Sequence, residues 1–255
     1  MRSTISAVIL SKNEESVIAD CLKSLDWVDE IILLDSGSQD STIEIANTYN
    51  AKVYYNLEWQ GFGKQRQLAQ SYASSDYILM IDSDERISEN LKNSIIEILT
   101  QENTSRDLVY SCNRRNLFID KYLSHGGWYP DKVIRIYHKS IIYNDNLVHE
   151  SLNYGDRPVI NLHGDILHLT CRDLSTFTKK QIAYAEDWAN ERFIVGKKTS
   201  LLSAFTHAIF SFFKSYIIRA GFLDGAHGLV LSVSIFNYTL SKYLFLWAKC
   251  KSKQS

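Results

Sequence analysis

The stretch Asp76-Tyr77-Ile78-Leu79-Met80-Ile81-Asp82-Ser83-Asp84-Glu85 decides the fold class of this chain. Its apolar run, Tyr77 to Ile81, is typical of a strand that is buried on both faces of a sheet. The acidic turn that follows holds Asp82 and Asp84 one residue apart. A hard divalent cation takes such oxygen ligands and in turn binds phosphate oxygens. The stretch therefore predicts a metal-phosphate site at the end of a buried strand.

The residues before this stretch alternate between strand and helix patterns. Apolar runs predict strands at 5–10, 30–34 and 52–55, and helical patterns occur at 17–25 and 63–73. Ser41-Thr42-Ile43-Glu44 has the spacing of a capping box, and Ser88 is placed to open a helix that runs to about Leu99. Strands that alternate with helices predict an α/β fold with a mostly parallel sheet.

Polar clusters follow three of the predicted strands. They are Ser11-Lys12-Asn13-Glu14, Asp35-Ser36-Gly37-Ser38-Gln39-Asp40 and Asp82-Ser83-Asp84-Glu85. Ligands of parallel α/β sheets bind at the carboxyl ends of the strands, so the three clusters indicate a site there. The chain lacks the GxGxxG turn of dinucleotide-binding proteins after its first strand, and it lacks a GxxxxGK[ST] loop throughout. Both of those nucleotide-binding classes are therefore excluded.

The composition is that of a folded globular protein. Of its 255 residues, 45% are hydrophobic and 22% are charged. The four cysteines are scattered without a CxxC pair, so we expect reduced thiols and no zinc site. The apolar run near the N-terminus is too short for a signal peptide, and we expect a cytoplasmic protein.

The three strand ends together resemble glycosyltransferase family 2, whose members have the GT-A fold. Further stretches are similar to one subgroup, the lipopolysaccharide inner-core β-1,4-glucosyltransferases. These are His125-Gly126-Gly127-Trp128-Tyr129-Pro130-Asp131, Arg135-Ile136-Tyr137, Val148-His149-Glu150 and Gly221-Phe222-Leu223-Asp224-Gly225. The resemblance covers nearly the whole chain. It implies a Rossmann-like catalytic domain over residues 1–173, divided into a nucleotide-sugar half (1–105) and an acceptor half (106–173), with a helical extension over 174–255.

The resemblance also assigns roles in donor binding. Asp35 matches the position that recognises uracil, and Asn13 and Glu14 lie in the loop around the nucleoside. Lys64 and Arg66 are placed to contact the nucleotide, although a solvated helix start explains Lys64 equally well.

The implied cofactors are a divalent cation, Mn²⁺ or Mg²⁺, and a nucleotide-sugar donor, UDP-glucose. Asp82 and Asp84 match the ligands of the ribose and of the metal-diphosphate group. His168 is a candidate third metal ligand, because a neutral imidazole can complete a set of carboxylate ligands. A histidine with a hydrogen-bond partner in the core is the alternative.

An inverting displacement needs one general base that deprotonates the acceptor hydroxyl. The resemblance favours Glu150 for this role, with His149 orienting it, and Asp131 is the second candidate. A surface or capping carboxylate is the alternative reading of either residue.

The C-terminal segment differs from the rest of the chain in charge. Residues 1–195 carry a net charge of −8, whereas residues 196–255 carry +7 with Asp224 as their single acid. Apolar stretches at 201–223 and 228–248 lie between the basic residues, which favours a helix lying on an anionic membrane surface over nucleic-acid binding. A helix pair packed on the catalytic domain is the alternative.

These features lead to one primary hypothesis and two others. The primary hypothesis is a peripheral enzyme on the inner face of the bacterial inner membrane that glucosylates a heptose of the lipid A–core acceptor. The second is a family 2 enzyme that acts on a polyprenyl-phosphate or capsular glycan. The third is a non-catalytic membrane scaffold that binds sugar nucleotides. The oligomeric state is not predicted.

Overall fold

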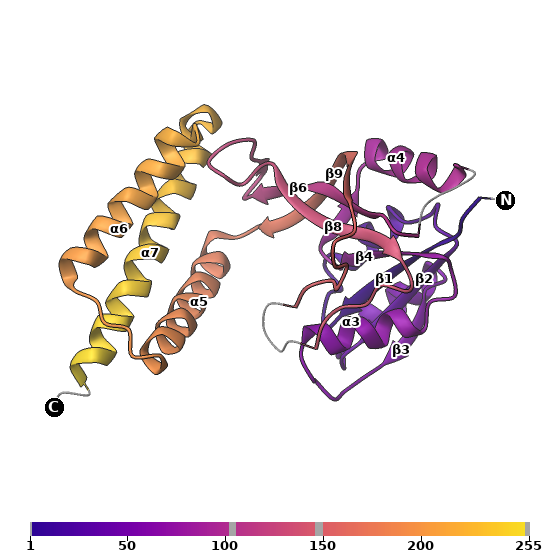
Figure 1. Cartoon of the computed structure of the whole chain (residues 1–255), viewed down its shortest axis with the longest axis horizontal. Coiled ribbons are helices and arrows are strands. Elements are labelled where there is room, and N and C mark those ends of the chain that lie inside the picture. The colour runs from indigo at the N-terminus through magenta and orange to yellow at the C-terminus, as the bar shows by residue number, and fades with distance from the viewer. Residues whose placement is uncertain (1, 102–105, 146–149, 253–255) are drawn as a thin grey trace. The chain divides into compact units, whose positions relative to one another are not determined.

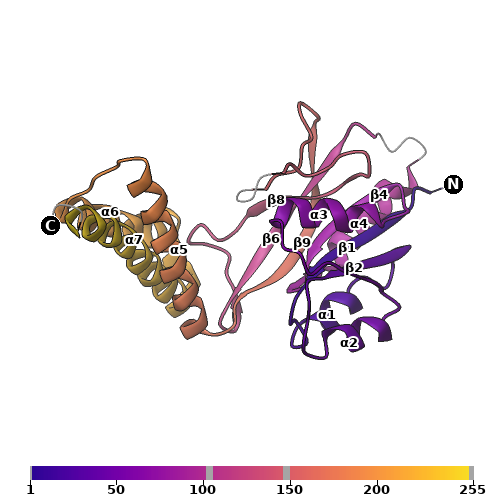
Figure 2. The ribbon, with the colours of Figure 1, turned by 90° about the horizontal axis from the view of Figure 1, so that it is seen from below.

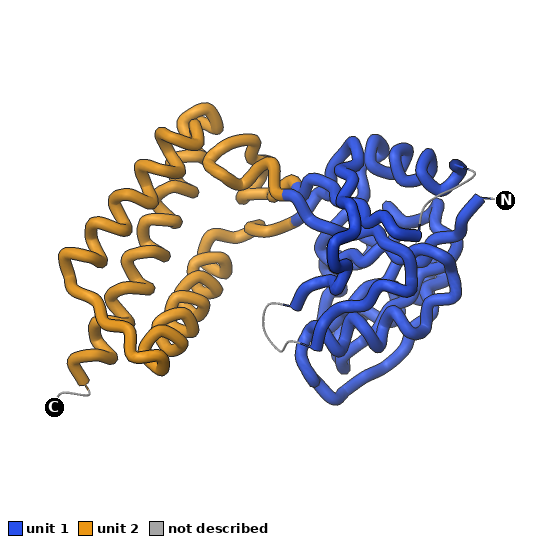
Figure 3. Tube along the Cα trace, viewed as in Figure 1, with its two compact units in different colours: residues 1–114, 132–168 blue, residues 115–131, 169–255 orange. Residues whose placement is uncertain are grey.

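The computed structural model describes residues 2–101, 106–145 and 150–252. Figure 3 shows the two compact units into which the chain divides. Unit 1 contains residues 1–114 and 132–168, and unit 2 contains residues 115–131 and 169–255. The predicted division into donor half, acceptor half and extension concerns function, and it stays a prediction.

Four parallel strands form one part of the sheet in unit 1. They are β1 (Ile5–Ser11), β2 (Glu30–Asp35), β3 (Lys52–Tyr55) and β4 (Tyr77–Asp82), in the order β3-β2-β1-β4. In the register, Ile9 of β1 lies between Leu33 of β2 and Ile81 of β4. All four predicted strands are therefore present, and they end at the same edge of the sheet.

Helices cover both faces of these strands, as Figure 2 shows. The helices α1 (Ile18–Lys23), α2 (Thr42–Thr48) and α4 (Glu89–Thr100) share one core cluster, and α3 (Phe62–Ser71) packs into the other. Along β1, Ala7 belongs to the first cluster and Val8 to the second. Successive side chains of a strand point to opposite faces, so an apolar run is buried on both sides. The predicted α/β fold class is confirmed.

The helix starts were predicted with mixed success. Ser88 begins α4 as expected, since its hydroxyl accepts a hydrogen bond from the Leu91 N–H at 3.4 Å. The helix predicted at Ser41 is also confirmed, since α2 begins at Thr42 with Ser41 as its N-cap residue, but the Ser41 side chain makes no capping hydrogen bond. Asp40 takes this role instead, and its Oδ1 accepts from the Thr42 N–H at 3.1 Å.

The remaining strands make the sheet mixed. They are β5 (Glu85–Ile87), β6 (Val109–Phe118), β7 (Lys121–Tyr122), β8 (Asp131–His138) and β9 (Val159–Cys171), and the full order is β3-β2-β1-β4-β8-β6-β9-β5 with β7 beside β6. β8 runs antiparallel to β4, with Ile136 opposite Leu79. β5 runs antiparallel to β9, with Glu85 opposite His168. The sequence assigned Glu85 to a turn and missed β5, because its pairing partner lies 83 residues later.

Three long helices dominate unit 2, which confirms the predicted helical extension. They are α5 (Leu174–Ile194), α6 (Leu201–Phe213) and α7 (Ala226–Ser252), with a π-helix at Lys214–Ile218 and a 3-10 helix at Gly221–Asp224. α7 packs along both α5 and α6 (Figure 1). At Gly228 of α7 a Cβ atom would lie 1.8 Å from the Gly221 carbonyl oxygen, so this close approach requires glycine.

The only acid of the C-terminal segment is withdrawn from the surface. Asp224 is 4% exposed, and its carboxylate accepts from the backbone N–H groups of Ser124 at 3.1 Å and His125 at 2.8 Å. The Lys121 ammonium lies 3.6 Å away. This carboxylate therefore orders the loop after β7 and does not offset the basic charge of the helices.

Two helical stretches are long and apolar enough to cross a membrane, by length and composition alone. They are Leu201–Ile218 and Ala226–Ser252, each with a mean hydropathy of 1.4. Only 17% of either window is buried inside the structure, and large apolar side chains of the first window, among them Leu202 and Ile209, are exposed.

Candidate active site

Hydrogen bonds join the loops that follow β1 and β2. Asn13 has a positive φ of 56°, its N–H donates to the Ser38 hydroxyl at 2.8 Å, and its Oδ1 accepts from the Gln39 N–H at 2.8 Å. The Glu14 N–H donates to the Thr42 hydroxyl at 2.8 Å. The structure therefore brings the predicted nucleoside-binding loop against the second polar cluster.

Asp35 organises the same region from the end of β2. It is 1% exposed, and its Oδ1 accepts from the N–H groups of Gly37 at 2.8 Å and Ser38 at 2.7 Å. The Ser38 hydroxyl donates to the other carboxylate oxygen. The carboxylate thereby fixes the loop that forms the edge of the predicted uracil site.

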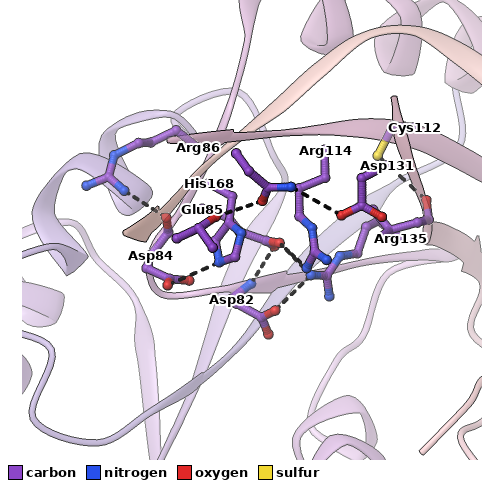
Figure 4. Close-up of polar contacts among 12 residues, drawn as sticks. Asp82, Asp84, Glu85, Arg86, Cys112, Arg114, Asp131, Arg135 and His168 are labelled. Atoms are coloured by element: carbon purple, nitrogen blue, oxygen red, sulfur yellow. Dashed lines mark hydrogen bonds and ion pairs between the residues drawn. The ribbon is translucent and has the colours of Figure 1, made fainter. Parts of the chain in front are cut away.

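A cluster of alternating charges lies at the end of β4, as Figure 4 shows. Arg135 of β8 donates to Asp82 at 2.7 Å and to Glu85 at 2.6 Å. Arg66 of α3 donates to the other oxygen of Asp82 at 2.9 Å. Arg114 of β6 approaches Glu85 at 3.7 Å. Both carboxylate oxygens of Asp82 are thus held by guanidinium groups.

The two carboxyl groups of this cluster are shifted in opposite directions. Burial alone would raise the pKa of Asp82, but the charges of Arg135 and Arg66 outweigh it and hold this pKa well below its usual range. Burial raises the pKa of Glu85, which is 0% exposed, against the opposing charge of Arg135. Asp82 is therefore the member that stays ionised across the physiological range.

Asp84 and His168 form the pair best suited to hold a metal. The Asp84 Oδ2 and His168 Nε2 atoms lie 3.3 Å apart, and the two side chains point toward each other in Figure 4. Their exposed fractions are 36% and 17%. Within the described ranges no group of three or more His, Cys, Asp or Glu side chains is assembled for a metal. The pair therefore offers two ligands and leaves the other coordination positions to water or substrate oxygens.

A cavity of about 470 Å³ opens beside the charge cluster in unit 1. Its lining combines charged, aromatic and aliphatic side chains: Arg66, Asp82, Arg114, Lys132, Val133, Ile134, Arg135, Tyr143, Glu150, Ser151, Leu152 and Tyr154. Small-molecule sites are commonly concave, with mostly apolar walls and a few convergent polar groups. The cavity has the size and the lining of such a site.

The structure places the two candidate bases differently. Glu150 lines the cavity, and its Oε1 lies 3.7 Å from the Nε of Arg66. Asp131 belongs to unit 2, where it accepts from the Asn116 amide at 3.4 Å. The predicted helper of Glu150, His149, lies outside the described residues. Glu150 is thus the candidate base that faces the cavity.

The structure separates Lys64 from Arg66 although both lie on α3. Arg66 is buried and lines the cavity beside Asp82. Lys64 is exposed and lines a second hollow of about 540 Å³, together with Gln60 and Asp145. Residues two apart on a helix face different directions, so the two cations serve different surfaces.

No role was predicted for Glu85 or Arg135, which lie at the centre of the charge cluster in the structure. One feature of the sequence, the charge of Arg135 within an apolar strand, could have indicated a buried ion pair. Arg135 interrupts the apolar strand Val133-Ile134-Arg135-Ile136-Tyr137, and a buried arginine needs a buried partner. The identity of that partner depends on how β8 pairs with β4, which no local pattern contains.

The fold has a clear counterpart among solved structures. The chain aligns over 98% of its length, and 92% of the other chain, with Staphylococcus aureus TarS (residues 1–349, in complex with UDP), at a TM-score of 0.50 and 16% identity. This similarity concerns the fold alone. A mixed α/β sheet of this kind, with an acidic turn after its fourth strand, is a GT-A-like fold.

The family follows from the sequence comparisons. The profile of glycosyl transferase family 2 matches residues 6–148. An uncharacterized glycosyltransferase of Rickettsia typhi is 30% identical over 241 residues, which is 90% of this chain and 82% of that protein. The chain belongs to glycosyl transferase family 2 and is a glycosyltransferase.

Two named relatives match shorter segments. LpsC of Rhizobium meliloti, a lipopolysaccharide core biosynthesis glycosyltransferase, is 33% identical over 99 residues, or 37% of each chain. Glucosyl-3-phosphoglycerate synthase of Petrotoga mobilis is 39% identical over 95 residues, which covers 31% of this chain and 29% of that protein.

Arg135→Met should destabilise unit 1 by about 3–5 kcal/mol, because it leaves buried Glu85 without its closest cation. The free energy of unfolding from urea titrations at pH 7 measures this. The folded-state pKa of Asp82 is depressed, so its ion pairs contribute above the unfolded pKa of about 3.9 and are lost as the pH falls. The difference in the free energy of unfolding between wild type and Arg135→Met should therefore become smaller below about pH 4.

The double variant Glu85→Gln/Arg135→Met is the control, since it removes the stranded carboxylate together with its partner. It should recover part of the lost stability. A double variant that is less stable than Arg135→Met, or a difference that grows toward acid pH, would contradict this account of the cluster.

Proposed function

We propose that this glycosyltransferase moves glucose from UDP-glucose to a heptose of the lipopolysaccharide inner core, with inversion at the anomeric carbon. The observation that carries the proposal is the placement of Glu150 in a cavity beside Asp82, at the carboxyl edge of the sheet. An inverting displacement needs a base, a bound donor and a neutralised leaving group, and it needs no protein nucleophile.

A divalent cation fits the Asp84–His168 pair. Carboxylate oxygen and imidazole nitrogen are common donors for Mn²⁺, and Mg²⁺ is often bound by one or two carboxylates together with substrate phosphates. When bound there, the cation would neutralise the charge of the departing diphosphate. Asp82 is engaged by two arginines, so we assign it to donor positioning, and its predicted role as a metal ligand remains a prediction.

The loops after β1 and β2 are the proposed nucleoside site. Asp35 holds the N–H groups of Gly37 and Ser38 in place, and Asn13 joins the two loops. A loop that is fixed before the ligand arrives loses little conformational entropy on binding. This rigidity supports the assignment of Asn13, Glu14 and Asp35 to the donor site.

Glu150 is the proposed base. Its carboxylate takes the proton of the acceptor hydroxyl while the acceptor oxygen bonds to the anomeric carbon, and the bond from that carbon to the diphosphate breaks. The Arg66 guanidinium lies 3.7 Å from Oε1 and helps to hold the carboxylate at the cavity. Tyr143 and Tyr154 provide aromatic walls that suit a sugar ring.

The proposed donor sugar and acceptor draw on the names of two relatives. The similarity to a lipopolysaccharide core biosynthesis enzyme supports a core acceptor, and the similarity to a glucosyl-3-phosphoglycerate synthase supports glucose. A polyprenyl-phosphate or capsular glycan is the alternative acceptor class.

We further propose that unit 2 attaches the enzyme to the cytoplasmic face of the inner membrane. Large apolar side chains are exposed along α6, including Leu202 at 75%, Ile209 at 60% and Phe213 at 48%. In the described residues from 196 to 252 all charged side chains are lysines or arginines except Asp224, which is buried. An apolar face with basic flanks suits the surface of an anionic bilayer.

Asp84→Asn should lower metal-dependent release of UDP from UDP-glucose by at least about 100-fold, because it removes the proposed anionic ligand. The assay measures UDP over a titration of Mn²⁺ and of Mg²⁺, and chelation should abolish the wild-type rate. Asp26→Asn is the matched control, since Asp26 is 72% exposed and pairs only loosely with Lys92 at 3.5 Å. Wild-type turnover in Asp84→Asn would refute the metal assignment.

Glu150→Gln should slow transfer by about 10²- to 10⁴-fold while the affinity for UDP stays unchanged, because the amide cannot accept the proton. Transfer to core oligosaccharide and UDP binding by calorimetry measure the two effects. Asp131→Asn is made in parallel. Normal transfer by Glu150→Gln, with loss in Asp131→Asn, would move the base to Asp131.

Vesicles containing anionic lipid should bind the protein, and neutral vesicles should bind it more weakly. Leu202→Gln/Ile209→Gln/Phe213→Gln should weaken this binding by at least about 100-fold, since each buried side chain contributes roughly 1.5–3 kcal/mol. The control Leu57→Gln/Ile142→Gln/Ile160→Gln removes exposed apolar side chains from unit 1. Sedimentation with vesicles measures the binding, and equal loss in both triple variants would argue against a membrane face on α6.

A further inference from the structure

The cavity in unit 1 carries more cationic than anionic groups on its lining. Four cationic side chains, Arg66, Arg114, Lys132 and Arg135, line it together with two carboxylates, Asp82 and Glu150. Asp82 is engaged by two of the arginines at 2.9 and 2.7 Å. Glu150 lies 3.7 Å from Arg66, and buried Glu85 pairs with Arg135 at 2.6 Å and approaches Arg114 at 3.7 Å. Three acids therefore stand against four cations, and this surplus of positive charge favours an anionic occupant.

Two guanidinium groups also present N–H donors that have no acceptor. Nη1 of Arg66 and Nε of Arg135 are buried and without a hydrogen-bond partner among the described residues. The side chains of both arginines are less than one-tenth exposed. Buried N–H donors normally have a hydrogen-bond acceptor, and each buried donor without one costs free energy. These atoms therefore indicate a ligand that brings oxygen acceptors into the cavity.

Lys132 adds a cation at the open side of the same cavity. It is exposed, and within the described part of the chain it has no hydrogen bond or ion pair. β8 runs antiparallel to β4, with Ile136 opposite Leu79, so residues that come earlier on β8 lie progressively nearer to the end of β4 and past it. Lys132 is therefore located just past the end of β4, on the lining of the cavity.

The donor diphosphate does not account for this charge. The pair proposed to hold the metal, Asp84 and His168, is not among the described residues that line the cavity. A divalent cation on that pair already offsets the charge of the leaving group. Arg66 and Asp82, which are assigned to the donor, also line the cavity, so the cavity adjoins the donor site and competition with UDP distinguishes an acceptor group from the diphosphate.

We propose that the cavity binds an acceptor through an anionic substituent, a phosphate monoester or a carboxylate, with Lys132 as its outer cation and Arg66 and Arg135 as its inner donors. The inference rests on the proposed function only in naming the ligand as the acceptor. A phosphate monoester carries a charge of about −1.5 to −2 and three strong acceptor oxygens, which match unpaired guanidinium donors. Val133, Leu152 and Tyr154 supply apolar surface for the adjoining sugar.

Titration calorimetry with methyl phosphate tests the proposal on the full chain, in the absence and in the presence of saturating UDP and Mg²⁺. Wild-type protein should bind methyl phosphate under both conditions, and it should not bind the neutral probe methyl glucoside to the same extent. Lys132→Gln should weaken methyl phosphate binding about fivefold, as expected for the loss of one partly exposed cation. Lys139→Gln is the matched control, because Lys139 is an exposed lysine just past the other end of β8.

Each outcome decides between defined alternatives. Binding that Lys132→Gln weakens and Lys139→Gln does not, with UDP and Mg²⁺ present, supports the proposal. No methyl phosphate binding, or equal binding by wild type and Lys132→Gln, overturns it. Binding that UDP and Mg²⁺ abolish also overturns it, because the cations then serve the donor. If UDP itself fails to bind, the donor assignment fails, while methyl phosphate binding still reports on the cavity.

Discussion

The ion cluster formed by Asp82, Arg135 and Glu85 is the constraint on which the site depends. Asp82 is the last residue of β4 and Glu85 the first of β5, and one guanidinium from β8 binds both. The short turn between them is therefore anchored at both ends. Because Glu85 also lies opposite His168 in the β5–β9 register, the same anchor brings Asp84, within the turn, to the imidazole. A change in this cluster would therefore disturb both Asp82, which is assigned to the donor, and the turn that carries Asp84.

Such a buried ion cluster contributes little net free energy to the stability of a fold. Removing charges from water costs several kcal/mol per ion, and apolar side chains of similar volume often stabilise a protein more. Glu85 is fully buried, and burial raises its pKa despite the neighbouring arginine. Local departures from good packing rules tend to occur at functional sites. The cluster is best explained by what it positions, namely an ionised Asp82 at the cavity and a fixed turn that carries Asp84.

The sequence predicted the parts of this site that depend on local patterns. The apolar strand before Asp82, the start of α4 at Ser88 and the helices after Asp173 are all present, since burial periodicity and turn chemistry act within a few residues. The roles of Glu85 and Arg135 were missed because strand pairing between distant segments determines them. His168 was identified as a candidate by residue type, but its proximity to Asp84 depends on the β5–β9 register. The failed capping box at Ser41 shows the same limit on a smaller scale, since the neighbouring Asp40 satisfied the same N–H group.

The charge pattern of the chain is consistent with one kind of acceptor. In unit 1 the carboxylates at the cavity are engaged by arginines, which leaves Lys132 and two buried guanidinium donors for a ligand. In unit 2 the single acid after residue 195 is Asp224, whose carboxylate accepts hydrogen bonds from two backbone N–H groups. The helical surface of this segment is therefore basic and apolar. The carboxylates at the cavity are thus paired with cations, and the single acid after residue 195 is buried and absent from the helical surface. An anionic glycan that is attached to a lipid suits both surfaces. The charged group of the glycan complements the cations of the cavity. The membrane that holds the lipid offers an apolar phase and anionic headgroups to the apolar and basic surface of α6 and α7.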